Sequence, residues 1–166
     1  FMDIYAAMGR MHMREFGTTQ QQFAAVAAKN HGHSAHNPLA QYREAMSVEQ
    51  VLVASPISYP LTRPMCSPVS DGAAAAIVCN ESGLKCLQGD ARRAVRVLAC
   101  VLQTGSERAS NDLENPLVRK AAHRLYEQSG VSPQDVGVAE VHDATAIGEV
   151  LQSELLGLVP MGYGGP

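Results

Sequence analysis

Residues 136–157 read VGVAEVHDATAIGEVLQSELLG, a short apolar stretch followed by an amphipathic one. The first part, Val136 to Val141, predicts a strand. The second part, Thr145 to Leu156, predicts a helix that Gly157 closes. A strand that leads into a helix is the repeating unit of α/β folds, so this stretch favours an α/β fold.

The residues before this unit have the same order. Ala94 to Leu102 is rich in Val and Leu and predicts a buried strand, and Pro116 to Gln128 predicts an amphipathic helix that Gly130 ends. The apolar run Ala73 to Cys79 is compatible with a strand or a helix, and we predict a strand because turn residues end it within seven residues. From Ala94 onward the order is strand, helix, strand, helix, which predicts a layered α/β fold with helices packed on a sheet.

The N-terminal third is predicted to be helical. Met and aromatic residues recur at helical spacing and stop at Gly17, a residue typical of helix ends. Thr18 or Thr19 is expected to cap the second helix, and Ser47 the third. Prolines at 56, 60, 64 and 68 then predict an extended, looping passage. The predicted helices are Asp3 to Phe16, a stretch through Phe23 to Ala28 that ends near Gly32, and Val48 to Val53.

Composition sets the class of protein. The 166 residues are 46% hydrophobic and 17% charged with a net charge of -3, the balance of a soluble globular protein of one domain or pieces of two. Basic stripes typical of nucleic-acid binding are missing, and the longest apolar run is too short to span a bilayer. The four cysteines lack CxxC spacing and are expected to be free, buried thiols. The start at Phe1 and the Gly-rich end predict cuts through a longer protein.

Three segments carry a resemblance to a known family. They are KNHGHSAHNP at 29–38, LTRPMCSPVSDGAAA at 61–75, and EVHDATA at 140–146, which ELLG follows at 154–157. In their order and spacing over nearly the whole chain, they resemble an internal part of the thiolase superfamily, in the sterol carrier protein x (SCP2) branch, which includes acetyl-CoA acetyltransferases. The resemblance implies part of a layered α/β/α/β/α thiolase fold. It assigns 1–66 to the loop region, 67–90 to the end of the N-terminal half-domain, and 91–166 to the first part of the C-terminal half-domain.

The resemblance also implies site residues. In that family a cysteine takes the acyl group, and coenzyme A is a substrate, so no cofactor or metal is expected. By correspondence His142 occupies the position of an oxyanion-hole donor, and Ser67 that of a contact to the pantetheine arm of CoA. Met8 corresponds to a position near the acyl group, and Ala144 to a substrate contact.

The chain departs from the family pattern in one respect. It has no cysteine in a Cys-Ala-Ser-Gly-like context, no Gly-His-Pro, and no Cys-x-Gly after it. The family places the first upstream of Phe1 and the others downstream of Pro166. Because acyl transfer through an enzyme thioester needs an activated thiolate, the chain by itself is expected to be catalytically inactive.

The chemistry of an oxyanion hole supports a functional role for His142. An imidazole N–H donates to a developing oxyanion, and a following helix N-terminus favours the neutral ring. A structural histidine at a strand end is the alternative. Asp143 points the other way on an extended chain, so we predict that it caps the next helix.

Other polar residues have simpler interpretations. Ser67 lies between prolines, where contact with CoA and a local turn are equally compatible with the sequence. Cys66 has no base nearby in sequence, which argues against a nucleophile. His31, His33 and His36 lack the spacing and the fourth ligand of a metal site.

The leading interpretation is a thiolase-type acyltransferase of lipid and fatty-acid metabolism that cleaves a 3-ketoacyl-CoA or condenses two acyl-CoA molecules. One alternative is a thiolase-like retro-aldolase of steroid side-chain degradation, whose family tends to carry Tyr where His142 stands. Another is a non-catalytic CoA- or lipid-binding fragment. The complete protein is expected to be a homodimer or larger, to have a partner protein chain, and to be cytoplasmic, or peroxisomal in a eukaryote.

Overall fold

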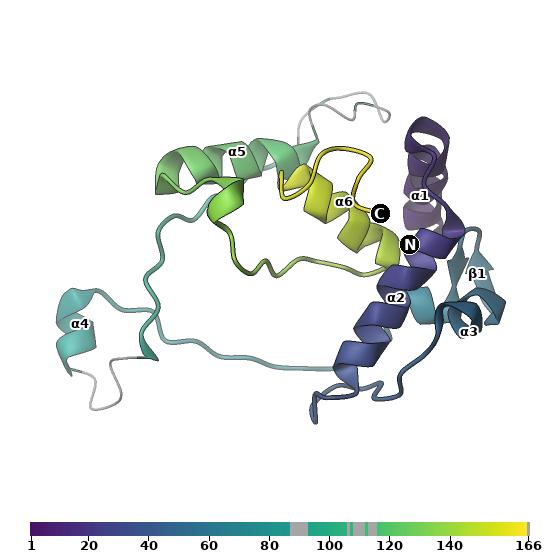
Figure 1. Ribbon diagram of the computed structural model, residues 1–166. Helices are drawn as coiled ribbons and strands as arrows, with labels where there is room; N and C mark the ends of the chain where they lie inside the picture. Colours follow the sequence, from purple (N-terminus) through teal and green to yellow (C-terminus); the bar gives the residue numbers. More distant parts are fainter. Residues whose placement is uncertain (87–92, 106, 108–111, 113–115, 166) are drawn as a thin grey trace.

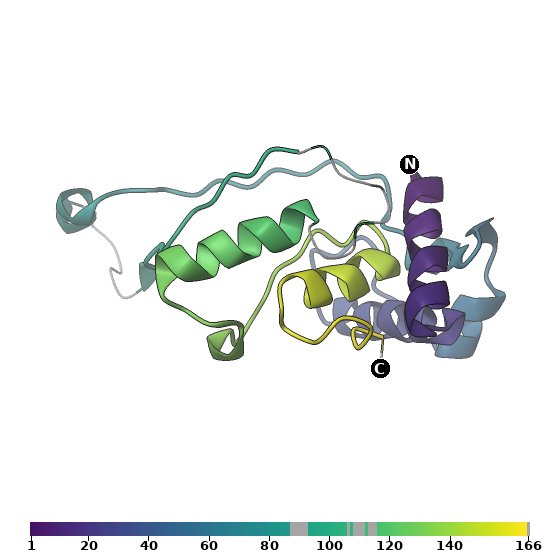
Figure 2. The ribbon, with the colours of Figure 1, turned by 90° about the horizontal axis from the view of Figure 1, so that it is seen from above.

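A computed structural model describes residues 1–86, 93–105, 107, 112 and 116–165, and it gathers most of the helices into one cluster (Figure 1). The N-terminal helices cross the last helix, and α5 lies beside that last helix at the edge of the cluster (Figure 2). None of the described helices has both the length and the apolar character that a membrane crossing requires. The helices are α1 (Met2–Phe16), α2 (Gln20–Ser34), α3 (Val48–Val53), α4 (Glu81–Cys86), α5 (Leu117–Ser129) and α6 (Ala146–Leu155).

The helix ends follow the local signals of the sequence. Gly17 adopts a left-handed conformation with φ 73° and donates its N–H to Met13 O, so α1 ends where predicted. Thr19 rather than Thr18 caps α2, in a capping box with Gln22. Ser47 caps α3 in the same way, as predicted. The prediction that α2 ends near Gly32 is slightly short, because the helix continues to Ser34.

A small hairpin follows α3. Strand β1 (Pro56–Ser58) pairs antiparallel with β2 (Leu61–Thr62), and a 3-10 turn, η1 (Arg63–Met65), begins directly after it. The predicted extended passage is therefore confirmed, apart from η1, where Pro64 occupies a first-turn position that tolerates proline. Side chains of Arg10 and Gln20 donate hydrogen bonds to the carbonyls of Tyr59 and Pro60 at 2.6 and 2.8 Å. These bonds hold the hairpin against α1 and α2.

The hydrophobic core lies where α1 and α2 pack on α6. Ile147 and Val150 of α6 are fully buried together with Phe23 of α2. Burial of each such side chain contributes about 1.5–3 kcal/mol relative to exposure. Gly9 allows α1 to approach α6 closely, because a Cβ at that position would overlap Cδ1 of Ile147.

The three predicted strands are wrong as elements of this structure. Residues 73–79, 94–102 and 136–141 run extended, but none of them belongs to a sheet within the described residues. A strand exists only when a neighbour pairs with its backbone N–H and C=O groups, and no described segment lies beside these three in that way. Large apolar side chains on them consequently face solvent, including Ile77, Val95 and Val138 at 81%, 89% and 86% exposure.

Helix α4 was not predicted, and it lies at the far end of the extended passage, away from the other helices (Figure 1). Asn80 begins this helix, since its side chain accepts a hydrogen bond from the N–H of Gly83 at 2.8 Å. The predicted division into 1–66, 67–90 and 91–166 stays a prediction. Its second boundary falls among residues 87–92, outside the described residues.

A buried polar pair links α1 to α6. Nε2 of His12 lies 2.9 and 3.1 Å from the two carboxylate oxygens of Glu154, and both side chains are excluded from solvent. The other ring nitrogen of His12 lies 2.8 Å from Oγ1 of Thr18. The N–H of Gly164 donates to Glu154 at 2.8 Å, so the pair also holds the segment that follows α6. Burial by itself raises the pKa of Glu154, but hydrogen bonds from His12, Gly162 and Gly164 bring that pKa below its ordinary value.

We predict that Glu154 stabilises the fold in a pH-dependent way. Because its folded-state pKa is lowered, its contribution is present above the ordinary carboxyl pKa and is lost as the pH falls through the folded value. Glu154→Gln should lower the free energy of unfolding by about 1–3 kcal/mol at about pH 7, and by progressively less as the pH is lowered below the ordinary carboxyl pKa. Urea unfolding over a series of pH values measures this, with Glu15→Gln as the surface control. An effect that stays constant across the whole acidic series would contradict the assignment.

The exposed extended segments predict self-association. Contiguous exposed apolar side chains drive proteins together, and unpaired strand-like segments present free backbone groups as well. We expect oligomers at micromolar concentration by light scattering, and a shift toward monomer when Ile77, Val95 and Leu102 are replaced by Lys. A monodisperse monomer of the unmodified chain would show that these segments do not drive self-association.

Candidate functional site

Two segments far apart in the sequence meet at one short backbone contact. Cys66 and Thr145 form an antiparallel bridge, and the N–H of Ser67 donates to the carbonyl of Ala144 at 3.0 Å. This contact sets the residues that follow η1 against the residues that precede α6. Backbone bonds of this kind fix both position and direction, so the two segments face each other in a defined register.

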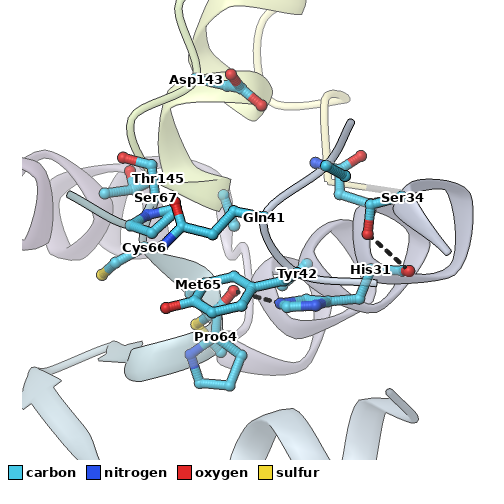
Figure 3. A pocket seen from close by; sticks show the side chains of 15 residues that line it. His31, Ser34, Gln41, Tyr42, Pro64, Met65, Cys66, Ser67, Asp143 and Thr145 are labelled. Carbon is cyan, nitrogen blue, oxygen red and sulfur yellow. Dashed lines mark hydrogen bonds between the residues drawn. The ribbon is translucent and has the colours of Figure 1, made fainter. Parts of the chain in front are cut away.

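An open pocket of about 250 Å³ lies between these segments and α2. Its walls come from four parts of the chain: the last turns of α2, the loop after α2, the passage from η1 onward, and the start of α6 (Figure 3). The lining residues are Ala27, Asn30, His31, Ser34, Ala40, Gln41, Tyr42, Pro64, Met65, Cys66, Ser67, Pro68, Asp143, Thr145 and Ala146.

One side of the pocket is an aromatic wall. The rings of His31 and Tyr42 stack with centroids 6.1 Å apart and planes 28° apart. Nε2 of His31 lies 3.3 Å from the carbonyl of Pro64, and the Ser34 hydroxyl donates to the backbone carbonyl of His31 at 3.0 Å. Figure 3 shows the ring of Tyr42 next to the ring of His31, while Gln41 extends from the same loop toward Ser67.

The pocket is mostly neutral. Asp143 is the one carboxylate among the lining residues, and no lysine or arginine of the described chain lines it. Hydroxyl, amide and imidazole groups alternate with apolar atoms from alanine, proline and methionine. Such a lining suits an uncharged ligand that carries both amide groups and apolar carbon.

Comparison with known proteins identifies the family. Residues 101–166 match the family model described as thiolase C-terminal domain-like. The chain is 36% identical to the benzoylsuccinyl-CoA thiolase subunit BbsB of Thauera aromatica, over 96% of the chain and 42% of that protein. It is 38% identical to sterol carrier protein 2 of Oryctolagus cuniculus, over 98% of the chain and 30% of that protein. The acetyl-CoA acetyltransferase of Methanothermobacter thermautotrophicus is 36% identical, over 99% of the chain and 43% of that protein.

The chain belongs to the thiolase superfamily. It spans less than half the length of the curated relatives it matches. Among solved structures, the one titled Ltp2-ChsH2(DUF35) aldolase has a TM-score of 0.77 at 24% identity, over 96% of this chain and 43% of that one. The fold is therefore part of a thiolase-like fold, as the resemblance implied.

In this thiolase-superfamily chain, the predicted site residues are only partly gathered. Ser67 lines the pocket, and its backbone N–H donates a hydrogen bond to the carbonyl of Ala144. His142 is exposed and lies next to Asp143, which lines the pocket, although His142 itself does not. Met8 is half-buried on α1, where it packs against the core cluster rather than lining the pocket. The roles assigned to these four residues stay predictions.

The prediction that Asp143 caps the helix is wrong. Thr145 is the capping residue of α6, and its hydroxyl accepts a hydrogen bond from the N–H of Gly148 at 3.2 Å. Residues 142–143 instead lie against Gly148, where an added Cβ would make ordinary contact with the Asp143 backbone at 3.4 Å. Asp143 is thereby free to face the pocket. Across the described residues, no three or more His, Cys, Asp or Glu side chains gather at one point as a metal site would require.

Sequence analysis missed Gln41 and Tyr42. They lie in the loop after α2, where neither helical nor strand periodicity gives a signal, and their place in the pocket depends on how the loop folds back on α2. The adjacent KNHGHSAHNP segment enters the sequence analysis only through the resemblance and as a rejected metal site. Its position at the end of a helix, followed by Asn-Pro, was the available indication that a structured loop follows.

The thiols also differ from prediction. Cys79, Cys86 and Cys100 are free and exposed rather than buried, because they lie on segments that nothing in the described chain covers. Cys66 is half-buried in the pocket wall, and burial raises the pKa of its thiol. A raised pKa leaves less thiolate at neutral pH, which argues against a nucleophilic role for Cys66.

We predict that Cys66 reacts last among the four cysteines. With limiting iodoacetamide at about pH 7.5, alkylation should begin at Cys79, Cys86 and Cys100, because these thiols are exposed and Cys66 is covered and less ionised. Peptide mass spectrometry over time measures the four rates. If Cys66 were alkylated first, it would be an activated thiol, and the account of the pocket wall would be incorrect.

Proposed function

We propose that the chain supplies the thioester-binding part of a thiolase-type acyl-CoA acyltransferase. The reaction is thiolysis of a 3-ketoacyl-CoA by CoA, or the reverse condensation of two acyl-CoA molecules, through an acyl-cysteine intermediate. The acyl-accepting cysteine and the Gly-His-Pro loop would come from parts of the protein outside these 166 residues. The family relationship supports this proposal, since the chain is similar to proteins named as thiolases and as an acetyltransferase.

The observation that carries the proposal is the backbone contact between residues 66–67 and 144–145. It joins the segment with the predicted CoA contact, Ser67, to the segment with the predicted oxyanion donor, His142. Ser67 lines the pocket, and His142 directly precedes Asp143, which lines it from the adjacent segment. A thioester whose pantetheine arm runs past Ser67 would bring its carbonyl oxygen toward His142, where a fixed N–H stabilises negative charge as it develops.

The chemistry of the lining fits the pantetheine arm of CoA. This arm is uncharged, and it alternates amide groups with apolar carbon in the same way as the pocket wall. Gln41, Ser67 and Tyr42 offer hydrogen-bonding groups for the amides. The phosphates of CoA would lie outside, because the pocket has a carboxylate and no basic side chain among its described residues.

A partner chain is part of the proposal. One relative is named as a subunit of a thiolase, and the similar solved structure is titled with two components, Ltp2 and ChsH2. The exposed apolar segments of this chain provide surface for association with further protein. We therefore propose that the active form contains more than one protein chain.

A retro-aldolase is the second candidate, because the similar solved structure is titled an aldolase. That likeness concerns the fold alone. His142 favours the thiolase interpretation, since the aldolase branch tends to carry Tyr at the corresponding position. Product analysis separates the two reactions: CoA-dependent release of a shortened acyl-CoA indicates a thiolase, and CoA-independent release of a ketone or an aldehyde indicates an aldolase.

We predict that His142→Ala lowers kcat by about 10²–10³-fold in the active protein that contains this chain, with KM nearly unchanged, as expected for removal of one oxyanion-hole donor. His142→Asn should recover part of the loss, because an amide also donates a hydrogen bond. The exposed position of His142 predicts little loss of stability in either variant.

Steady-state thiolysis of acetoacetyl-CoA, normalised by titration of active sites, measures these effects. His123→Ala is the matched control, since His123 is an exposed histidine on α5 that does not line the pocket. A folded His142→Ala protein with the kcat of the unmodified enzyme would end the oxyanion-hole assignment.

A further inference from the structure

A polar bracket ties α2 to the start of α6. Nζ of Lys29 donates to Oε1 of Glu149 at 2.6 Å, and Nδ2 of Asn30 donates to Oε2 at 2.7 Å. Lys29 also donates to Oδ1 of Asn30 at 2.8 Å. Each oxygen of the Glu149 carboxylate is therefore held by a different α2 side chain, and the three residues form a closed ring.

This bracket connects two opposite walls of the pocket. Asn30, together with His31 and Ser34, contributes the α2 wall. On the α6 side, Glu149 lies one turn inside the helix that Thr145 caps, and Asp143, Thr145 and Ala146 form the wall there. The bracket spans the gap between the walls at the point where α2 and α6 meet.

Apolar packing beneath the bracket does not set the gap by itself. Ala27 of α2 and Ala146 of α6 are both buried, and hydrophobic burial is non-directional. Charge-assisted hydrogen bonds to both carboxylate oxygens are directional, so they fix where α6 sits along α2.

We propose that Glu149, with Asn30 and Lys29, is a positioning residue that sets the separation of the α2 and α6 walls and so places the 142–145 turn for reaction. This inference rests on the function proposed above. None of the three residues needs to touch reacting atoms. They act by fixing the position of α6, which directly follows the residues from His142 to Thr145. A displacement of about 1 Å at a reacting group can cost about 100-fold in rate.

The exposure of the bracket separates this role from a structural one. The side chains of Lys29 and Glu149 are 45% and 25% exposed. Ion pairs this accessible to water contribute little to folding stability. If this exposed pair had no positioning role, its removal would change neither the stability of the fold nor kcat. If it is a positioning pair, its removal lowers kcat and leaves stability nearly unchanged.

The test compares Glu149→Ala, Glu149→Gln, Asn30→Ala and Asn30→Ala/Glu149→Ala in the active protein. We expect Glu149→Ala to lower kcat about 10- to 100-fold, while its unfolding midpoint moves by no more than about 4 °C. Glu149→Gln should recover part of kcat, because its amide oxygen still accepts from Asn30. The double variant should be no slower than the slower single variant, as expected when two residues act as one unit.

The matched control is Glu15→Ala, which removes a different surface pair, Arg14 with Glu15, on α1. It should leave kcat within twofold of the unmodified protein. If kcat of Glu149→Ala also stays within twofold, the inference is overturned. It is overturned as well if Glu149→Ala and Glu149→Gln lose kcat equally, or if the loss of kcat in Glu149→Ala matches a loss of folded protein.

A second readout does not depend on turnover. Hydrogen–deuterium exchange of the peptide covering 142–150 should become faster in Glu149→Ala and stay unchanged in Glu15→Ala, because the bracket holds this segment against α2. Unchanged exchange in Glu149→Ala would overturn the inference, whatever the activity. If the unmodified protein turns over no acyl-CoA ester while exchange does become faster, the proposed function fails and the bracket still fixes the pocket wall.

Discussion

The structure depends on the packing of α6 against α1 and α2. Its apolar face, with Ile147 and Val150 fully buried, holds together helices that are more than a hundred residues away in sequence. Gly9 makes this close approach possible on the α1 side. The buried His12–Glu154 pair and the Lys29–Asn30–Glu149 bracket then add directional hydrogen bonds to hydrophobic contacts that are themselves non-directional.

The pocket is a consequence of this packing of α6. Because α6 is fixed, the residues before it reach back to Cys66 and Ser67 and form a backbone bridge with them. The loop after α2 closes the remaining side with Gln41 and Tyr42. A thiolase-superfamily chain thereby presents a mostly neutral, partly apolar pocket whose walls come from four separate parts of the sequence.

Local signals in the sequence predicted the helices well and the strands poorly. Gly17, Ser47 and Gly130 ended or began helices where expected, since capping depends on neighbouring residues alone. The runs at 73–79 and 94–102 carry strand composition, yet a strand also needs a partner, and none pairs with them within the described residues. For the site, Ser67 was predictable through the resemblance. Tyr42 and Glu149 were not, because their roles arise from contacts across the fold.

The most direct test is a crystal structure of the active protein with acetyl-CoA bound. We predict that the pantetheine arm lies in the pocket beside Ser67 and Tyr42, with the thioester oxygen about 3 Å from a ring nitrogen of His142. We also expect the phosphates to lie outside this lining. Acetyl-CoA bound elsewhere on the protein, or a thioester turned away from His142 with the pocket empty, would contradict this prediction.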